Sequence, residues 1–263
     1  MIVSRRGDRL VLVRQVDHQT QCGLLAEAWG NADFARPEPY EPLVTAAAWH
    51  DEGWRRFDDA PEVDAEGSPI DFPDLDRSRH VALYAEGIRA AVRRDPRAGL
   101  IVSLHGQGLH EARLGLDGPP RPRERQEPAV RAFLEEQEVL QERLRRQIGA
   151  GPALNDWAWA GFRLLQAWDV LSLYLLWFGL PRGRSGSMPQ VPRRTGDPGL
   201  DVTIAPAGES ACIVRPWPFA EDEVRAPVAA RSIPARRYES DEDLRSELGA
   251  ASWEMLDVRL RRG

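Results

Sequence analysis

The chain has 263 residues and a formal net charge of −6 at pH 7, a size that suits one large domain or one domain with a small appendage. All of its positive charge is carried by arginine, because the sequence contains no lysine. This composition excludes Schiff-base chemistry on a lysine side chain, and the lack of a basic block argues against binding to nucleic acid. An anionic substrate would have to be held by arginine or by a metal ion.

The cysteines and the apolar segments bear on the cellular compartment. Cys22 and Cys212 are too few for a disulfide framework, so we expect two buried free thiols in a reducing compartment, with a single bridge between them as the alternative. The first residues contain no apolar segment typical of a signal peptide, and the longest apolar run, residues 170–180, is too short to span a bilayer. The sequence therefore predicts a cytoplasmic protein without membrane contact, and it does not indicate an oligomeric state.

The predicted elements begin with a β-hairpin over residues 1–15, whose turn lies at Gly7-Asp8. Asp17 follows as the expected N-cap of a helix that extends to about Trp29. His18 would lie in the first turn of that helix and is the first of several histidines predicted near a helix end.

A second helix is predicted to end in the pair His50-Asp51. The preceding residues 46–48 are all alanine, the best helix former, and Gly53 suits a C-terminal cap. Neutral imidazole and ionised carboxylate are both metal ligands, and together they suit Zn, Fe, Mn or Co. An adjacent His-Asp pair is a weak signal when taken alone, so its meaning depends on the rest of the chain.

Further helices are predicted after an acidic, turn-rich loop at residues 57–77. One starts at Ser78, runs to about residue 94 and carries His80 in its first turn, and the next covers residues 100–109 and carries His105. Residues 114–128 are rich in Pro, Gly and Arg and are expected to be exposed, and an amphipathic helix covers residues 127–148. We expect His110 to be an ordinary polar residue.

The most apolar helix is predicted at residues 157–178, with Asn155 as its N-cap and apolar residues on almost every side, as is typical of a central helix. It carries a thin polar seam that includes Arg163, Asp169 and Ser172. A buried carboxylate such as Asp169 needs a cation or a metal ion beside it. A salt bridge to Arg163 or to another arginine would meet this need as well as a metal ion would.

The character of the sequence changes after this helix. Residues 183–199 are expected to form a linker, followed by strands at residues 202–204, 212–214, 224–233 and 255–260, with a short helix from Ser240 before the last strand. These strands would join the N-terminal hairpin in one antiparallel sheet. The predicted fold is therefore mainly α, a helical bundle with a small antiparallel β appendage, divided into residues 1–182 and a β-rich region at residues 183–263.

Four of the five histidines form an ordered series with two aspartates: His18, His50-Asp51, His80, His105 and Asp169. This series resembles the HD-domain superfamily, whose members carry a histidine, a His-Asp pair and a distant aspartate on an all-α core. Residues 166–172 (QAWDVLS) are similar to the helix that brings in the last aspartate of that superfamily. The additional histidines resemble those of its two-metal branch, which includes HD-GYP cyclic-dinucleotide phosphodiesterases and mixed-valent diiron oxygenases.

The resemblance to the HD domain covers roughly residues 10–180, and the Gly-Tyr-Pro signature of the cyclic-dinucleotide branch is absent. The whole chain, with residues 50–54 (HDEGW) and 216–219 (PWPF), also resembles an uncharacterised bacterial family placed near the HD superfamily. The C-terminal part has no counterpart in the HD core.

The resemblance implies a dinuclear metal site. One ion would be held by four side chains: His18, His50, Asp51 and Asp169. The second ion would be held by His80 and His105, with Asp51 as the bridging ligand. The expected cofactors are therefore two divalent ions, Fe, Mn or Zn. Histidines near helix ends and two carboxylates in apolar contexts support such a site independently, because hydrogen bonds alone hardly satisfy them.

The function implied by the resemblance is a metal-dependent phosphohydrolase that acts on a phosphate mono- or diester of a small anionic molecule. His50 and Asp51 would take part in catalysis, and Arg55, Arg56 or Arg113 would neutralise phosphate charge. Two alternatives stay open at this point. A mixed-valent diiron oxygenase of the HD type shares the same ligands, and a non-catalytic metal-binding or interaction module needs no substrate.

Overall fold

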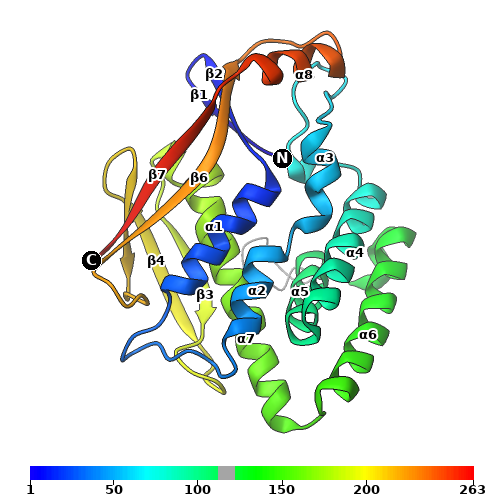
Figure 1. Ribbon diagram of the computed structural model, residues 1–263, viewed down its shortest axis with the longest axis vertical. Helices are drawn as coiled ribbons and strands as arrows, with labels where there is room; N and C mark the ends of the chain where they lie inside the picture. Colours follow the sequence, from blue (N-terminus) through cyan, green and yellow to red (C-terminus); the bar gives the residue numbers. More distant parts are fainter. Residues whose placement is uncertain (112–121) are drawn as a thin grey trace.

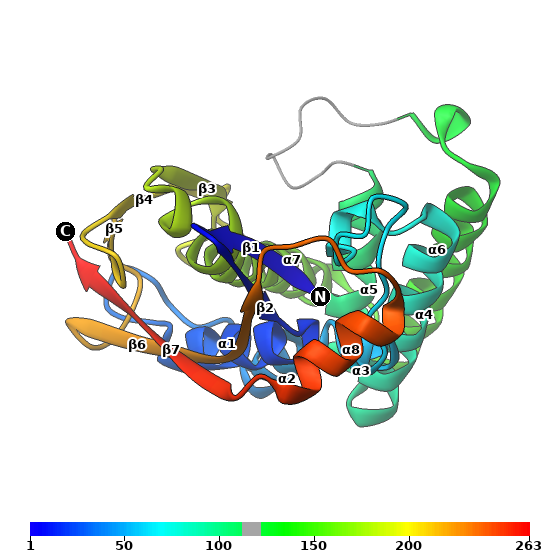
Figure 2. The same ribbon diagram turned by 90° about the horizontal axis from the view of Figure 1, so that it is seen from above.

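A curved sheet and a set of long helices make up the computed structural model, which describes residues 1–111 and 122–263. Two helices, α1 (Gln15–Ala28) and α7 (Pro152–Leu173), run through the middle of the molecule (Figure 1). The sheet curls around one side of this pair, and the other long helices cover the opposite side (Figure 2). These covering helices are α2 (Glu41–Trp49), α4 (Arg77–Arg94), α5 (Pro96–His110) and α6 (Pro128–Ile148).

The sheet has seven strands in the order β1-β2-β6-β7-β5-β4-β3. Neighbouring strands are antiparallel except β5 and β7, which are parallel. The strands are β1 (Ile2–Arg6), β2 (Arg9–Val13), β3 (Gly186–Val191), β4 (Leu200–Pro206), β5 (Ala211–Arg215), β6 (Glu223–Pro234) and β7 (Trp253–Arg262). The N-terminal hairpin joins the later strands through β2 and β6, where Leu10 pairs with Ile233. Residues 1–182 and 183–263 therefore contribute strands to the same sheet.

The expectation of a mainly α fold with a small antiparallel β appendage was wrong. Of the described residues about 52% are helical and 21% are in strands, and the seven strands form a mixed half-barrel. The prediction made β4, β5 and β7 too short, and it missed β3, which lies inside the predicted linker despite Pro189. Because β3 is an edge strand paired only with β4, a residue without an N–H is tolerated there, and the register shifts between Met188 and Val191.

Burial of α7 on all sides explains its composition. The helix continues through a π-helical turn (Tyr174–Phe178) and a 3-10 turn (Leu180–Arg182). Within the described residues, the continuous stretch Pro152–Arg182 is the one helix long and apolar enough to cross a membrane, and 78% of its apolar window is buried in the fold. Contacts with β3 on one side and with α1, α2 and α5 on the other are those of a core helix.

Several helices start earlier than the sequence predicts. Helix α1 begins before Asp17, whose carboxylate pairs with Arg14 at 2.7 Å and caps no helix. Asp76, and not Ser78, caps α4, because its side chain accepts a hydrogen bond from the backbone of Arg79. Helix α8 (Asp241–Ala250) does start as predicted, after Ser240, and lies at the top of the molecule in Figure 1.

Gly53 positions the His-Asp pair by a close backbone approach and not as a helix cap. It lies in η1 (Glu52–Trp54), directly after Asp51, where this turn packs on α4. A Cβ at residue 53 would collide with the carbonyl oxygen of Leu83 and crowd the backbone nitrogen of Gly87. Since both obstacles are backbone atoms, neither can move without shifting α4.

We expect Gly53→Ala to lower the free energy of unfolding by about 1–3 kcal/mol, the usual cost of overpacking a tight contact. Denaturant or thermal unfolding measures the change. Gly249→Ala in α8 is the matched control, because a Cβ there meets nothing within 4 Å and alanine favours a helix. Equal stability of Gly53→Ala and the natural chain would contradict the proposed backbone contact.

Candidate metal centre

Four helices bring most of the predicted ligands to one buried position. His18 lies on α1, His50 and Asp51 follow the end of α2, His105 lies on α5 and Asp169 lies on α7. All five residues are at most 6% exposed. His18 and Asp169 are in hydrogen-bond contact although 151 positions separate them in the chain. We call these five residues the His/Asp cluster.

Asp169 is at the centre of the His/Asp cluster. Its Oδ1 atom lies 3.0 Å from Nε2 of His18 and 4.0 Å from Nε2 of His50, and its Oδ2 atom lies 3.6 Å from Nε2 of His105. Oδ2 of Asp51 lies 3.4 Å from Nε2 of His50 and 3.9 Å from Nε2 of His18. Three imidazole nitrogens and two carboxylates therefore face a common space.

His50 indicates that protein groups alone do not satisfy this arrangement. Its Nδ1 donates to the carbonyl oxygen of Ala47 at 2.9 Å, so in the neutral ring Nε2 carries a lone pair. That lone pair faces the carboxylates of Asp51 and Asp169. Within the described residues, neither Nε2 of His50 nor Oδ1 of Asp51 has a hydrogen-bond partner. When both carboxylates are ionised, acceptors face acceptors in a buried space, which is unfavourable, and a cation between them removes the cost.

The pKa values of the His/Asp cluster agree with a site built for a cation. Burial raises the pKa of Asp51 to about 8, and burial lowers the pKa of His105 to about 4 and that of His50 below its usual value. Burial alone would raise the pKa of Asp169, but His18, whose Nε2 lies 3.0 Å away, and the other two imidazoles lower it to about 2. At neutral pH the metal-free protein thus holds one ionised and one protonated carboxyl group here.

His80 lies apart from the His/Asp cluster. Its ring packs edge to face against three aromatic side chains, with centroid distances of 5.1, 4.9 and 5.7 Å to Trp54, Tyr84 and His110. Burial lowers the pKa of His80 to about 3. The structure therefore brings together five of the six predicted ligands and places the sixth beside His110, which the sequence did not single out.

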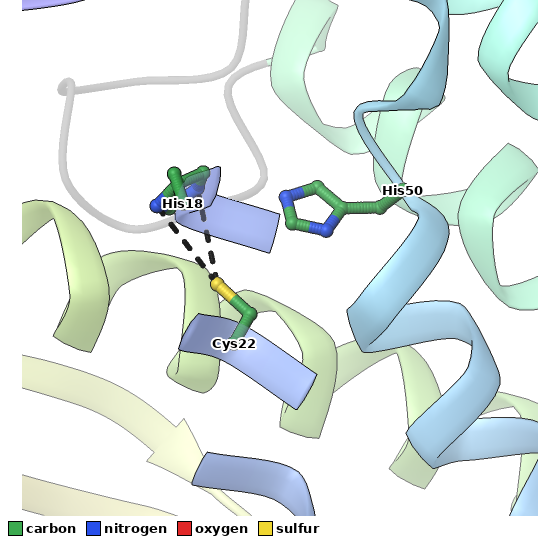
Figure 3. Close-up of side chains that lie close together, drawn as sticks. All are labelled: His18, Cys22 and His50. Carbon is green, nitrogen blue, oxygen red and sulfur yellow. Dashed lines mark hydrogen bonds between the residues drawn. The ribbon is translucent and has the colours of Figure 1, made fainter. Parts of the chain in front are cut away.

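Cys22 is a neighbour of the His/Asp cluster that the sequence analysis left aside. One ligand atom from each of His18, Cys22 and His50 lies within 4.8 Å of the others (Figure 3). The His-x-x-x-Cys spacing was the available signal, because residues four apart share a helix face. Sγ lies 3.8 Å from Nε2 and 3.9 Å from Nδ1 of His18, so the sulfur sits beside the ring and not beyond either nitrogen.

The environment of Cys22 favours a thiol in the wall of the site over a metal ligand. Its Sγ donates to the carbonyl oxygen of Trp168 at 3.6 Å. Burial, with the charges of Asp169 and Asp51, raises the pKa of the thiol well above its usual range. Because thiolate is the form that binds metals, Cys22 would first have to lose its proton, and the nitrogen and oxygen donors of the His/Asp cluster are the stronger candidates for a cation.

Arg55 and Arg56 line a surface groove of about 430 Å³ on the outer side of the His-Asp turn, together with Arg93 and Arg94 of α4. Arg55 is exposed and pairs with Glu52 at 2.7 Å. These two predicted catalytic arginines thus face this groove, whose lining includes no member of the His/Asp cluster. Arg113 lies outside the described residues.

A hydrogen-bond chain links this groove to Asp51. The side-chain amide of Gln19 donates to Glu52 at 3.0 Å, and its Oε1 atom accepts from the backbone nitrogen of Asp51 at 2.8 Å. Gln19 is 3% exposed. Glu52 also accepts both hydrogen bonds of Arg55. Arg55 therefore contributes to the position of Asp51 through Glu52 and Gln19.

The polar side chains along α7 make two separate sets of contacts. Arg163 donates to Oε1 of Gln166 at 2.8 Å and to the carbonyl oxygen of Pro189 on β3 at 2.8 Å, so it ties α7 to the sheet edge. Asp169 faces the three imidazoles instead, and Ser172 contacts Nδ1 of His18 at 2.7 Å. The part of the seam nearer the end of α7 belongs to the candidate site.

Fold and site together define an α/β protein with a buried His/Asp cluster between four helices. Residues 1–235 match the family described as "Protein of unknown function (DUF3891)", and the chain belongs to this family. No curated protein matches the chain significantly, and no solved structure does. The family description names no activity and does not link the chain to the HD-domain superfamily, so that resemblance stays a prediction.

Metal binding is expected to release a proton, because Asp51 is protonated below its pKa of about 8 in the metal-free protein and has to ionise as a ligand. The apparent affinity should rise about tenfold per pH unit towards that pKa and level off above it. Calorimetric titration in buffers of different ionisation heat counts the protons. An affinity that does not change over this range would contradict the assignment of Asp51.

Cys22→Ser is expected to leave metal affinity almost unchanged, because the sulfur takes no part in coordination. The cobalt-loaded natural chain should show no sulfur-to-cobalt charge-transfer band in its absorption spectrum. His18→Ala, one turn away on the same helix face, is the comparison that should weaken binding. A charge-transfer band that disappears in Cys22→Ser would instead make Cys22 a ligand.

Proposed function

We propose that the chain is a metal-dependent phosphohydrolase whose His/Asp cluster holds a divalent ion. The observation that carries this proposal is the lone pair on Nε2 of His50, which faces the carboxylates of Asp51 and Asp169 and has no hydrogen-bond partner among the described residues. Three imidazoles with two carboxylates are donors that suit Fe, Mn, Zn or Co. When bound, such an ion supplies polarisation of a phosphoryl oxygen and a nucleophilic water near neutral pH.

The residues of the cluster have distinct tasks in this proposal. His18, His50 and His105 bind through Nε2, and burial keeps His50 and His105 neutral, which the ligand role requires. Asp169 is ionised before the ion arrives, and Asp51 becomes so on binding. The two carboxylates then balance the two positive charges of the ion, so the buried site carries no net charge.

One ion is favoured over the two that the HD resemblance implies. His105 faces Asp169 at 3.6 Å and shares the cluster with His18 and His50. His80 packs on Trp54, Tyr84 and His110 instead. A diiron oxygenase requires the second ion, so this geometry favours the hydrolase.

Metal analysis of protein prepared without chelator or nickel affinity is the first test, with about one equivalent per chain expected from the single cluster. The metal-loaded protein should hydrolyse p-nitrophenyl phosphate or bis-p-nitrophenyl phosphate. Asp51→Asn should lower this activity more than about 100-fold, since changes beside the ligands alone cost 10–100-fold. Asp257→Asn, a surface carboxylate paired with Arg225, is the control expected to keep it.

Removal of dioxygen separates the alternatives. The hydrolase keeps its rate under anaerobic conditions, whereas turnover that stops without dioxygen would contradict the proposal in favour of the oxygenase. Protein that binds one ion but hydrolyses neither ester under any metal loading would count for a non-catalytic metal-binding module.

A further inference from the structure

A chain of three hydrogen bonds leads from the sheet to the His/Asp cluster. The amide nitrogen Nε2 of Gln21 donates to the carbonyl oxygen of Ala226 on β6 at 2.6 Å. The hydroxyl of Ser172 donates to Oε1 of Gln21 at 2.6 Å, and Oγ of Ser172 lies 2.7 Å from Nδ1 of His18. Gln21, Ser172 and His18 are at most 1% exposed, so water does not compete for these bonds.

The direction of every bond in this chain follows from its first member. The carbonyl oxygen of Ala226 cannot donate, so Gln21 presents its NH₂ group to β6 and its oxygen to Ser172. That oxygen cannot donate either, so the single hydroxyl proton of Ser172 lies between Ser172 and Gln21. Only lone pairs of Ser172 are left for the imidazole, and Nδ1 of His18 therefore carries the proton.

We propose that Gln21 and Ser172 are positioning residues that fix the tautomer of His18, with Ala226 of β6 as their anchor. The neutral ring then keeps its lone pair on Nε2, the atom that faces Asp169 and Asp51. Ionised Asp169, 3.0 Å away, favours the other tautomer, in which Nε2–H would donate to it and would offer a cation no lone pair. The hydrogen bonds of Gln21 and Ser172 act against this preference. The use of Nε2 as a ligand rests on the proposed function, whereas the tautomer is a property of the metal-free protein.

A comparison with His50 shows why this chain of hydrogen bonds matters. We call the bonds from Ala226 through Gln21 and Ser172 to His18 the relay. Nδ1 of His50 is fixed locally, by the carbonyl oxygen of Ala47 three residues earlier. Nδ1 of His18 instead contacts Ser172, 154 positions later in the chain. A partner that fixes the second imidazole nitrogen is a general requirement of histidine ligands and raises their basicity. For His18 this partner is Ser172, which Gln21 connects to Ala226 on the sheet.

The test reads the tautomer of His18 directly, by long-range ¹H–¹⁵N correlation NMR of the metal-free protein at a pH where the spectrum shows a single proton on the ring. In the natural chain Nδ1 should be protonated. In Ser172→Ala the proton should move to Nε2. Gln21→Met should have the same effect although Ser172 stays in place, because the hydroxyl is then free to donate to Nδ1. An unprotonated Nδ1 in the natural chain, or an unchanged tautomer in both variants, would contradict the proposal that Gln21 and Ser172 fix the tautomer of His18.

The matched control is Ser103→Ala, a second fully buried serine, whose hydroxyl bonds to Gln137 on α6. It should leave the His18 tautomer unchanged, and thermal unfolding of each variant checks that the fold is kept. Zinc affinity, measured with a competing chelator, should fall about 10–100-fold in Ser172→Ala and Gln21→Met.

The outcomes separate this inference from the proposed function. If the tautomer moves in both variants but the natural chain binds no metal, the relay stands and the proposed function falls. If the natural chain binds metal and hydrolyses phosphate esters while neither variant changes the tautomer, the relay falls and the proposed function stands.

Discussion

The cost of desolvating charge governs this structure. Two aspartates and three histidines, each at most 6% exposed, lie at the centre of an otherwise apolar core. An isolated carboxylate in such surroundings costs more free energy than ordinary packing contacts return. The metal-free chain meets this cost by keeping Asp169 ionised between the imidazoles and Asp51 protonated. A divalent ion would allow both carboxylates to be ionised, and the proposed function rests on that exchange of a proton for a metal ion.

How far the sequence predicts this site depends on how local each signal is. The His-Asp pair at the end of an alanine-rich helix and Asp169 in an apolar helix are local patterns. As these patterns predict, the pair follows the end of α2 and Asp169 is buried within α7. His80 and His105 have similar local signatures. Which of them faces Asp169 is decided by how α4 and α5 pack against α7, and no local pattern contains that information.

The errors in the predicted fold have the same origin. Pro189 indicates a break in a strand, yet it is tolerated because β3 has a neighbour on one side only. Gly53 indicates a helix cap, yet it is needed because η1 touches the backbone of α4. In both cases the sequence marks the correct residue as special, and only the neighbouring element, distant in the chain, gives the reason.

Helix α1 explains why the sheet belongs to the site and is not an addition to a helical bundle. Gln19 and Gln21 lie about 200° apart around the helix axis, since each residue turns the helix by about 100°. Gln19 reaches Asp51 and Glu52 on the helical side, whereas Gln21 reaches Ala226 on the sheet. His18 lies between these two directions, with Asp169 at one ring nitrogen and Ser172 at the other. A helix can hold a buried ligand from both sides in this way only if both of its faces are covered. The half-barrel covers the face that the other helices leave open, and the sheet is therefore a wall of the candidate site.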